Sequence, residues 1–270
     1  MLVEGDAEEI LIPVMIKQVL GVSLDELGIS LINIRSTGFK NVALLFNEDR
    51  IRKKCGIITD LDATILDTSP DPTDSRELKE LKRKCQASQD AGESRRGILT
   101  SFEANNNWVK AFYADHTFEV DFIKCGNVDQ VVATINDVYT LPSKIAEAKE
   151  EIESGDVRRF GSRVLKMVAQ EGKGWFAILL SKQIHTKTVI PDYILDAIFF
   201  TNPNFSTEVW ANIFKYRLKY IKNDDSNSEI IELTKKIEAF QLKELTFEAI
   251  RNEISKTLKT DIINKILGKF

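Results

Sequence analysis

The sequence is poor in the residues that build zinc sites. Its three cysteines, Cys55, Cys85 and Cys125, are far apart and match no zinc-ligand spacing. Its two histidines, His116 and His185, are too few for a histidine-rich metal site. Any metal must therefore be held mainly by carboxylates, which favours magnesium, manganese or calcium over zinc.

Long apolar runs are also absent. No stretch approaches the roughly 20 apolar residues that a membrane-spanning helix needs. The start of the chain lacks the basic-then-apolar layout of a secretory signal, so we expect a cytoplasmic protein without membrane association. At 270 residues, 43% of them hydrophobic and 29% charged, the chain is typical of a globular protein that buries a substantial core.

An excess of positive charge is missing as well. The formal net charge of −4 argues against a protein that coats nucleic acid without specificity. It does not exclude a nuclease, because metal ions neutralise an acidic active site and local basic stretches then grip phosphates. Residues 76–84 and the pair Arg95-Arg96 are such stretches. The alternative for the first stretch is a solvated helix face with Glu/Lys pairs four residues apart.

Strand-like and helix-like segments alternate over the first 125 residues. The apolar run Cys55–Asp60 is typical of a strand buried on both faces. Strand–helix–strand units imply parallel strands joined by right-handed crossovers, so we predict an α/β fold with a mostly parallel sheet. The predicted strands are Met1–Val3, Ile29–Ile34, Cys55–Asp60, Gly97–Phe102, Val109–Tyr113 and Thr117–Phe122, and the predicted helices are Ala7–Leu20, Val42–Phe46 and Arg76–Cys85.

The pattern changes after about Val128. Residues 128–221 are predicted to be helical. The polar run Asn223–Ser228 predicts a solvated linker. Residues 229–268 then form a final helical segment, whose apolar residues are spaced for a single stripe.

Two acidic clusters follow predicted strands. Glu4 and Glu8 are four residues apart at the start of the chain, and Asp60 and Asp62 form a D-x-D at the end of a buried strand. On an extended segment, alternation would put both aspartates on one face. Parallel strands gather their ends at one edge, and clustered carboxylates repel each other unless a cation neutralises them. We therefore predict a magnesium-type site and phosphodiester chemistry, the plain alternatives being first-turn helix acids and an aspartate turn or cap.

Four stretches together resemble a known family. Val3–Pro13, Ile58–Ala63, Thr117–Glu119 and Glu171–Ala177 are similar to the C-terminal nuclease half of the overcoming-lysogenization-defect (OLD) family. The resemblance covers roughly residues 1–200. It implies the TOPRIM fold of topoisomerases, primases and some nucleases, a Rossmann-like, mostly parallel sheet flanked by helices.

The resemblance also implies site residues. Phe118 stands where the family's Thr-Leu-Glu motif has leucine, which is a conservative departure. Five carboxylates exceed the needs of one ion but suit two Mg²⁺ or Mn²⁺ ions about 4 Å apart. Glu4, Glu8, Asp60, Asp62 and Glu119 would bind the metal, and Lys173 would neutralise charge that builds on the scissile phosphate.

The sequence contains no recognisable ATP site. Gly172-Lys173-Gly174 superficially resembles the end of a P-loop, but Met167 replaces the first glycine and Gly174 replaces the serine or threonine. Full-length family members carry an ABC-type ATPase before the nuclease. Because the first motif begins at residue 3, we expect a fragment or a split gene whose partner is an ATPase domain or subunit. A homodimer is compatible with the sequence.

We predict four segments. They are a TOPRIM core over residues 1–126, a helical insertion over 127–168, the end of the TOPRIM region over 169–204 and a helical C-terminal extension over 205–270. The insertion follows from the need for Lys173 to return to the site.

The leading hypothesis is a metal-dependent DNA endonuclease or nickase, with a role in phage defence that the family resemblance suggests. The alternative is a non-catalytic TOPRIM module that binds nucleic acid or serves as an assembly platform for the ATPase. A primase or topoisomerase ranks third. A topoisomerase needs a tyrosine nucleophile, and nothing in the sequence marks Tyr113, Tyr139 or Tyr193 for that role.

Overall fold

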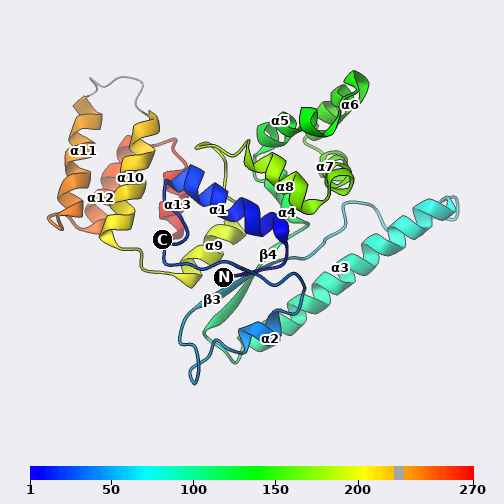
Figure 1. Ribbon diagram of the computed structural model, residues 1–270, viewed down its shortest axis with the longest axis horizontal. Coiled ribbons are helices and arrows are strands. Elements are labelled where there is room, and N and C mark those ends of the chain that lie inside the picture. The colour runs from blue at the N-terminus through cyan, green and yellow to red at the C-terminus, as the bar shows by residue number, and fades with distance from the viewer. Residues whose placement is uncertain (222–227) are drawn as a thin grey trace.

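A four-stranded parallel sheet forms the centre of the molecule (Figure 1). The computed structural model describes residues 1–221 and 228–270. The strands lie in the order β2-β1-β3-β4, and β3 and β4 pair from Cys55↔Val109 to Asp60↔Ala114. The predicted α/β class is therefore confirmed. The strands are β1 (Leu2–Val3), β2 (Ile32–Asn33), β3 (Cys55–Asp60) and β4 (Val109–Ala114).

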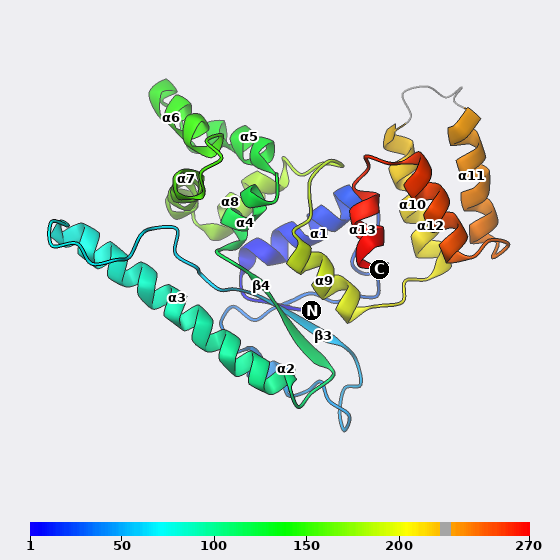
Figure 2. The same cartoon turned by 180° about the vertical axis from the view of Figure 1, so that it is seen from behind.

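Both faces of the sheet are covered, which explains the apolar character of β3. Ile57 packs with residues of α2 (Phe39–Ala43) and α3 (Arg76–Glu103), whereas Ile58 belongs to the core on the opposite face. Figure 2 shows α9 (Asp192–Thr201) running beside β3 and β4. Successive side chains of a strand point to opposite faces, so a strand covered on both sides has no polar face.

The other helices form two groups that share α1 (Asp6–Leu20) (Figure 1). Helix α8 packs along α1 in the first group, and α10 contacts α1 in the second. No helix within residues 1–221 and 228–270 is both long and apolar enough to cross a bilayer. The first group is α4 (Phe118–Lys124), α5 (Val128–Val138), α6 (Pro142–Ile152), α7 (Val157–Glu171) and α8 (Lys173–Ser181), and the second is α10 (Thr207–Ile221), α11 (Ser228–Gln241), α12 (Phe247–Thr257) and α13 (Ile263–Lys269).

The predicted C-terminal helical segment is three helices rather than one. Helix α11 packs on α10, α12 packs on α11, and α13 contacts α12 and α9. The ring of Trp210 contacts those of Phe214, Phe247 and Phe270. The linker predicted over residues 223–228 lies outside the described residues, except for Ser228, which begins α11.

Two predicted strands are wrong. Gly97–Phe102 lies in α3, which is much longer than the predicted helix Arg76–Cys85. Leu99 is buried with β4, so tertiary packing outweighs the weak helix propensity of Gly97 and Thr100 in this segment. Thr117–Phe122 begins α4, and its polar positions are buried as well, so the alternation did not mark a solvated face.

Two further boundaries are shifted. The predicted strand Ile29–Ile34 is reduced to the two residues of β2. The predicted helix Val42–Phe46 is α2, which begins and ends three residues earlier.

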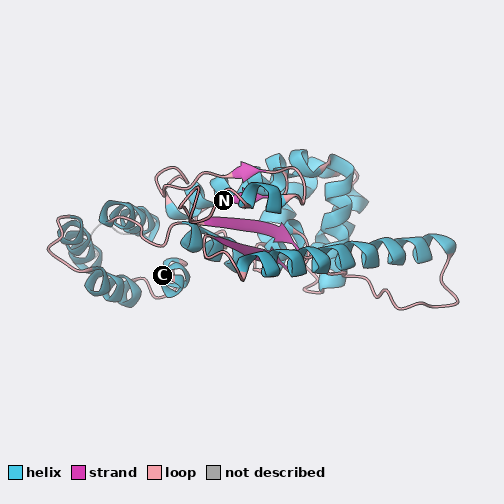
Figure 3. Ribbon diagram, turned by 90° about the horizontal axis from the view of Figure 1, so that it is seen from below, coloured by secondary structure: helices cyan, strands magenta, loops and turns pink. Residues whose placement is uncertain are grey.

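Helix α3 projects from the sheet (Figure 3). Among its residues only Gly92 and Leu99 are buried, so solvent surrounds most of its N-terminal half. The loop before it is fastened along the helix, because Lys82 contacts Asp74 at 2.6 Å. Helix and loop therefore form one arm.

Candidate functional site

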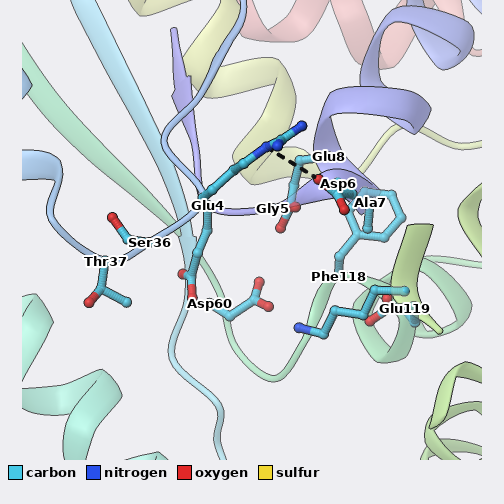
Figure 4. A pocket seen from close by; sticks show the side chains of 12 residues that line it. Glu4, Gly5, Asp6, Ala7, Glu8, Ser36, Thr37, Asp60, Phe118 and Glu119 are labelled. Carbon is cyan, nitrogen blue, oxygen red and sulfur yellow. Dashed lines mark ion pairs between the residues drawn. The ribbon is translucent and has the colours of Figure 1, made fainter.

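An acidic pocket of about 420 Å³ opens at the edge of the sheet where the parallel strands end. Figure 4 shows Glu4, Glu8 and Asp60 pointing toward a common space. The lining residues come from β3, the first turns of α1, α4 and α8, the turn between β1 and α1, and the loop after β2. Five of the six predicted site residues line this pocket, namely Glu4, Glu8, Asp60, Glu119 and Lys173.

Glu4 lies directly after β1, where the chain turns into α1. The hydroxyl of Thr59 donates a hydrogen bond of 2.6 Å to Glu4 Oε2. Thr59 is a fully buried polar residue in an otherwise apolar strand. This bond fixes the carboxylate of Glu4 against the end of β3.

Glu8 lies in the first turn of α1 and is only 4% exposed. Of the neighbouring acids, Asp6 also lines the pocket and Glu9 does not, and the amide of Asn33 donates hydrogen bonds to both, at 3.0 Å and 2.7 Å. Burial, with a smaller contribution from the charges of Glu119 and Glu4, raises the pKa of Glu8 to about 7. The helix dipole alone does not explain the position of Glu8, because an acid placed only for that reason would be exposed to solvent.

Asp60 is the last residue of β3 and is almost completely buried. Its Oδ1 atom is buried and accepts no hydrogen bond from any residue that the structure describes. Burial raises the pKa of Asp60 well above its usual range, and the charge of Glu8 adds to this effect. A cation would supply the partner that Oδ1 lacks.

Asp62 lies beside the pocket rather than in its lining. The residue has a left-handed φ of 54°, so the extended conformation expected for the D-x-D is wrong. The physical reason is pairing beyond the strand, because the backbone N–H groups of Leu61 and Asp62 donate to carbonyls that follow β4 or end it. The carboxylate of Asp62 lies 3.5 Å from Arg95 Nη2.

Glu119 lies in the first turn of α4 and is 3% exposed. Asp121 fixes the preceding turn, since its Oδ2 accepts hydrogen bonds from the backbone N–H groups of Asp115 and His116. Asp115, His116 and Asp121 are close enough to share a metal ion. Their contacts with each other and with Lys124 already engage these polar atoms, which is typical of a support for Glu119.

Lys173 is the first residue of α8. Gly172, with a φ of 83°, joins α7 to α8 in a conformation that side-chain-bearing residues rarely adopt. Partial burial opposes the charge of Lys173, but Glu119 and the other carboxylates outweigh it and raise the pKa of the ammonium group. Lys173 therefore stays protonated at neutral pH.

The pocket has too little positive charge for its acids. Arg95 lies within 4.0 Å of both Glu4 and Asp62. Among the described residues, no ion pair within 4.0 Å involves Glu8, Asp60 or Glu119. All these groups offer oxygen atoms, which Mg²⁺, Mn²⁺ and Ca²⁺ prefer as ligands. The donor set and the unpartnered Asp60 Oδ1 therefore fit a hard divalent cation.

The sequence interpretation missed three contributors to this site. Thr59 could have been found from the sequence, because it is a polar residue in an apolar strand. Arg95 was predicted only as a candidate phosphate contact. Arg35 lines the pocket from the loop after β2, has a φ of 54° and lies 4.0 Å from Asp6. No local pattern marks Arg35, and none connects Arg95 to the acidic clusters, because the partners of both residues are distant in sequence.

Comparisons with known proteins identify the fold. Residues 1–62 match the family model described as the overcoming lysogenization defect protein-like TOPRIM domain. The C-terminal region of the Burkholderia pseudomallei OLD protein is similar with a TM-score of 0.52 and 23% sequence identity, over 76% of this chain and 96% of that one. The C-terminal region of the Xanthomonas campestris pv. campestris OLD protein gives a TM-score of 0.51 and 22% identity, over 77% and 93% of the two chains.

No curated protein matches the chain. The segment matched by the family model contains Glu4, Glu8, Asp60 and Asp62, the two acidic clusters from which the prediction started. The predicted resemblance is confirmed: this chain carries an OLD-like TOPRIM domain, and its fold is that of the C-terminal regions of OLD proteins.

Proposed function

We propose that this chain is a metal-dependent DNA endonuclease or nickase that hydrolyses phosphodiester bonds with two Mg²⁺ or Mn²⁺ ions. The observation that carries the proposal is the uncompensated acidic pocket. Asp60 and Glu8 are buried there beside Glu4 and Glu119, and no ion pair within 4.0 Å joins either of them to a cation of the described chain. Buried carboxylates of this kind are costly unless a cation neutralises them, so their presence favours a metal site.

The five carboxylates would hold the ions. Ions held there would supply an activated water for attack on phosphorus and charge stabilisation of the leaving oxygen. The first-turn positions of Glu8 and Glu119 and the strand-end positions of Glu4 and Asp60 place the ligands on regular elements, which keeps them preorganised. Asp62, next to the pocket, completes the set.

Two cationic side chains on the rim suit a phosphate substrate. Lys173 is protonated and lines the pocket, so it would neutralise charge that builds on the scissile phosphate. Arg35 lines the same pocket and is 77% exposed, so its guanidinium is free to meet a backbone phosphate.

A covalent tyrosine mechanism is less favoured by the surroundings of Tyr193. Its hydroxyl is buried and has no hydrogen-bond partner in the described chain. Burial, followed by the charges of Asp60 and Glu8, raises the pKa of Tyr193 well above its usual range, which makes the phenolate hard to form. Hydrolysis therefore explains the site better than the religation chemistry of a topoisomerase.

The wider role of the chain is proposed from the family resemblance. We propose coupling to an ABC-type ATPase domain or subunit, action in the cytoplasm and a role in phage defence. We also propose that residues 127–168 are an insertion in the TOPRIM region and that residues 205–270 are an extension of it.

A plasmid-nicking assay with Mg²⁺ or Mn²⁺ tests the proposal. Wild type is compared with Glu4→Ala, Asp60→Ala and the matched control Glu9→Ala, whose carboxylate faces Asn33 outside the pocket. We expect metal-dependent nicking in wild type and Glu9→Ala and its loss in the other two variants. Equal cleavage in all four proteins would overturn the assignment.

Other outcomes identify the competing functions. DNA binding without cleavage at any metal concentration would support a non-catalytic TOPRIM module. Relaxation with religation, or primer synthesis, would indicate a topoisomerase or a primase.

A further inference from the structure

Arg95 is a nearly buried cation inside the acidic cluster. Its side chain is 11% exposed, and its Nη2 donates a hydrogen bond to the carbonyl of Asp60. The same nitrogen lies 3.5 Å from Asp62 Oδ2 and 3.8 Å from Glu4 Oε2. Charged N–H···O bonds are usually about 2.7–2.9 Å, so Arg95 neutralises both carboxylates without binding either tightly.

Arg95 keeps unused hydrogen-bonding capacity. Its Nε is buried and has no acceptor among the described residues. The Oδ1 atom of Asp60 is likewise buried without a donor. Buried donors and acceptors are rarely left unsatisfied. The two unsatisfied groups beside one cluster therefore indicate that Arg95 and Asp60 have different partners in another state of the protein.

Helix α3 holds Arg95 in this place through Gly92. A Cβ atom at Gly92 would lie 2.1 Å from the carbonyl oxygen of Leu61, so only glycine lets the helix touch the D-x-D turn. Residues three apart on a helix share a face, and Arg95 therefore projects toward the same turn. The close approach of α3 delivers the guanidinium to the carboxylates.

We infer that Arg95 is a resident counter-ion for Glu4 and Asp62, and that a divalent ion entering between these two carboxylates must displace it. The inference rests on the proposed function, because it treats the cluster as a two-ion site. Glu8, Asp60 and Glu119 have no such competitor among the ion pairs of the described chain. The first ion therefore binds on their side, and the second binds more weakly against the charge of Arg95.

Titration of the metal-free protein with Mn²⁺, followed by calorimetry and by electron paramagnetic resonance of free Mn²⁺, tests the inference without an activity readout. Wild type should bind two ions with unequal affinity. Arg95→Gln should tighten the weaker site by about tenfold, because a positive charge about 4 Å away is removed, and should leave the tighter site unchanged. Arg95→Lys keeps the charge and should stay near wild type.

Two further variants keep the test decisive. Arg96→Gln is the matched control, because Arg96 pairs with Glu93 on the surface of the same helix, and it should bind Mn²⁺ like wild type. Arg95→Met retains an apolar stem and replaces Arg95→Gln if that variant does not fold by circular dichroism.

The outcomes separate this inference from the proposed function. If wild type binds two ions and the uncharged Arg95 variants bind them equally well or more weakly, Arg95 is not a competitor and the inference fails alone. If wild type binds no Mn²⁺, the two-ion site itself is wrong, and the proposed function and this inference both fail.

Discussion

The acidic pocket and the Arg217–Asp261 pair both bury charge, but only the second compensates it. Arg217 is 4% exposed and donates hydrogen bonds of 3.0 and 2.6 Å to the two carboxylate oxygens of Asp261. It also donates to the carbonyls of Val19 (2.9 Å) and Thr186 (2.7 Å). Asp60, by contrast, keeps a buried carboxylate oxygen without any partner in the described chain.

The difference separates a structural role from a functional one. Arg217 lies on α10 and connects it to the end of α1, to the segment before α9 and to the segment before α13. It therefore fastens the C-terminal helices to the core. The carboxylates of the pocket make few contacts that hold the fold together, and they repel each other. A binding role therefore explains their presence better than a structural one.

Replacing Asp60 tests the pocket most strongly. Asp60→Asn keeps the shape but removes the buried charge, so we expect metal-dependent nicking to fall by about a thousandfold or more. The metal-free protein should become more stable, because the desolvation and repulsion of this carboxylate disappear. Nicking rates and urea unfolding in EDTA measure the two effects. A loss of stability together with activity would break the comparison.

Replacing Arg217 should have the opposite signature. Arg217→Met leaves Asp261 buried without its partner, and we expect the free energy of unfolding to fall by about 3–5 kcal/mol. Equilibrium urea unfolding measures this change. The double variant Arg217→Met, Asp261→Leu should recover much of the loss, because no unpaired charge remains. A single variant with a change below about 1 kcal/mol would contradict a fastening role.

The pH dependence of stability sharpens the comparison at Glu8. Its carboxyl titrates near 4.5 when unfolded and at about 7 in the fold, so the folded protein holds the proton more tightly. Stability therefore falls as pH rises from about 4.5 through 7, by about 3 kcal/mol at most for this group. The melting temperature in EDTA should drop between about pH 5 and pH 7, and Glu8→Gln should flatten this slope.

Metal binding gives the corresponding control. Because Mg²⁺ competes with the proton on Glu8, its apparent affinity should rise over the same pH range. A melting temperature in EDTA that rises with pH would show that the buried acids do not govern stability there.

The smallest expected effect concerns the placement of Lys173. Gly172→Ala places a side chain at a φ of 83°, and we expect a loss of about 1–2 kcal/mol with a modest fall in nicking. Gly155→Ala is the matched control, because Gly155 also has a positive φ and free space around its Cβ position. It should lose stability but retain nicking. Equal nicking by both variants would show that the position of Lys173 does not affect the reaction.

The sheet and most of the pocket could be predicted because their signals are local. The apolar run Cys55–Asp60 predicts a strand that is covered on both faces. Parallel strands also bring their carboxyl ends to one edge of the sheet. Glu4 and Asp60 meet there for that reason. The conformation of Asp62 could not be predicted in this way, because it depends on backbone pairing with the segment after β4.

Tertiary contacts explain what the sequence did not reveal. Gly97–Phe102 has a strand-like composition, and only its packing on the sheet keeps it helical in α3. Arg95 and Arg217 satisfy partners far away in the chain, and no periodicity reports such pairs. Charge compensation is therefore visible only in three dimensions.

The arm formed by α3 gives the pocket a mechanical connection to its surroundings. The helix extends about 24 Å from Gly92 to its outer end at Arg76, at 1.5 Å per residue. Its fulcrum is the contact between Gly92 and the carbonyl of Leu61. Arg95 lies one turn beyond this contact, so any tilt of the helix about Gly92 would change the distances from its guanidinium to Glu4 and Asp62.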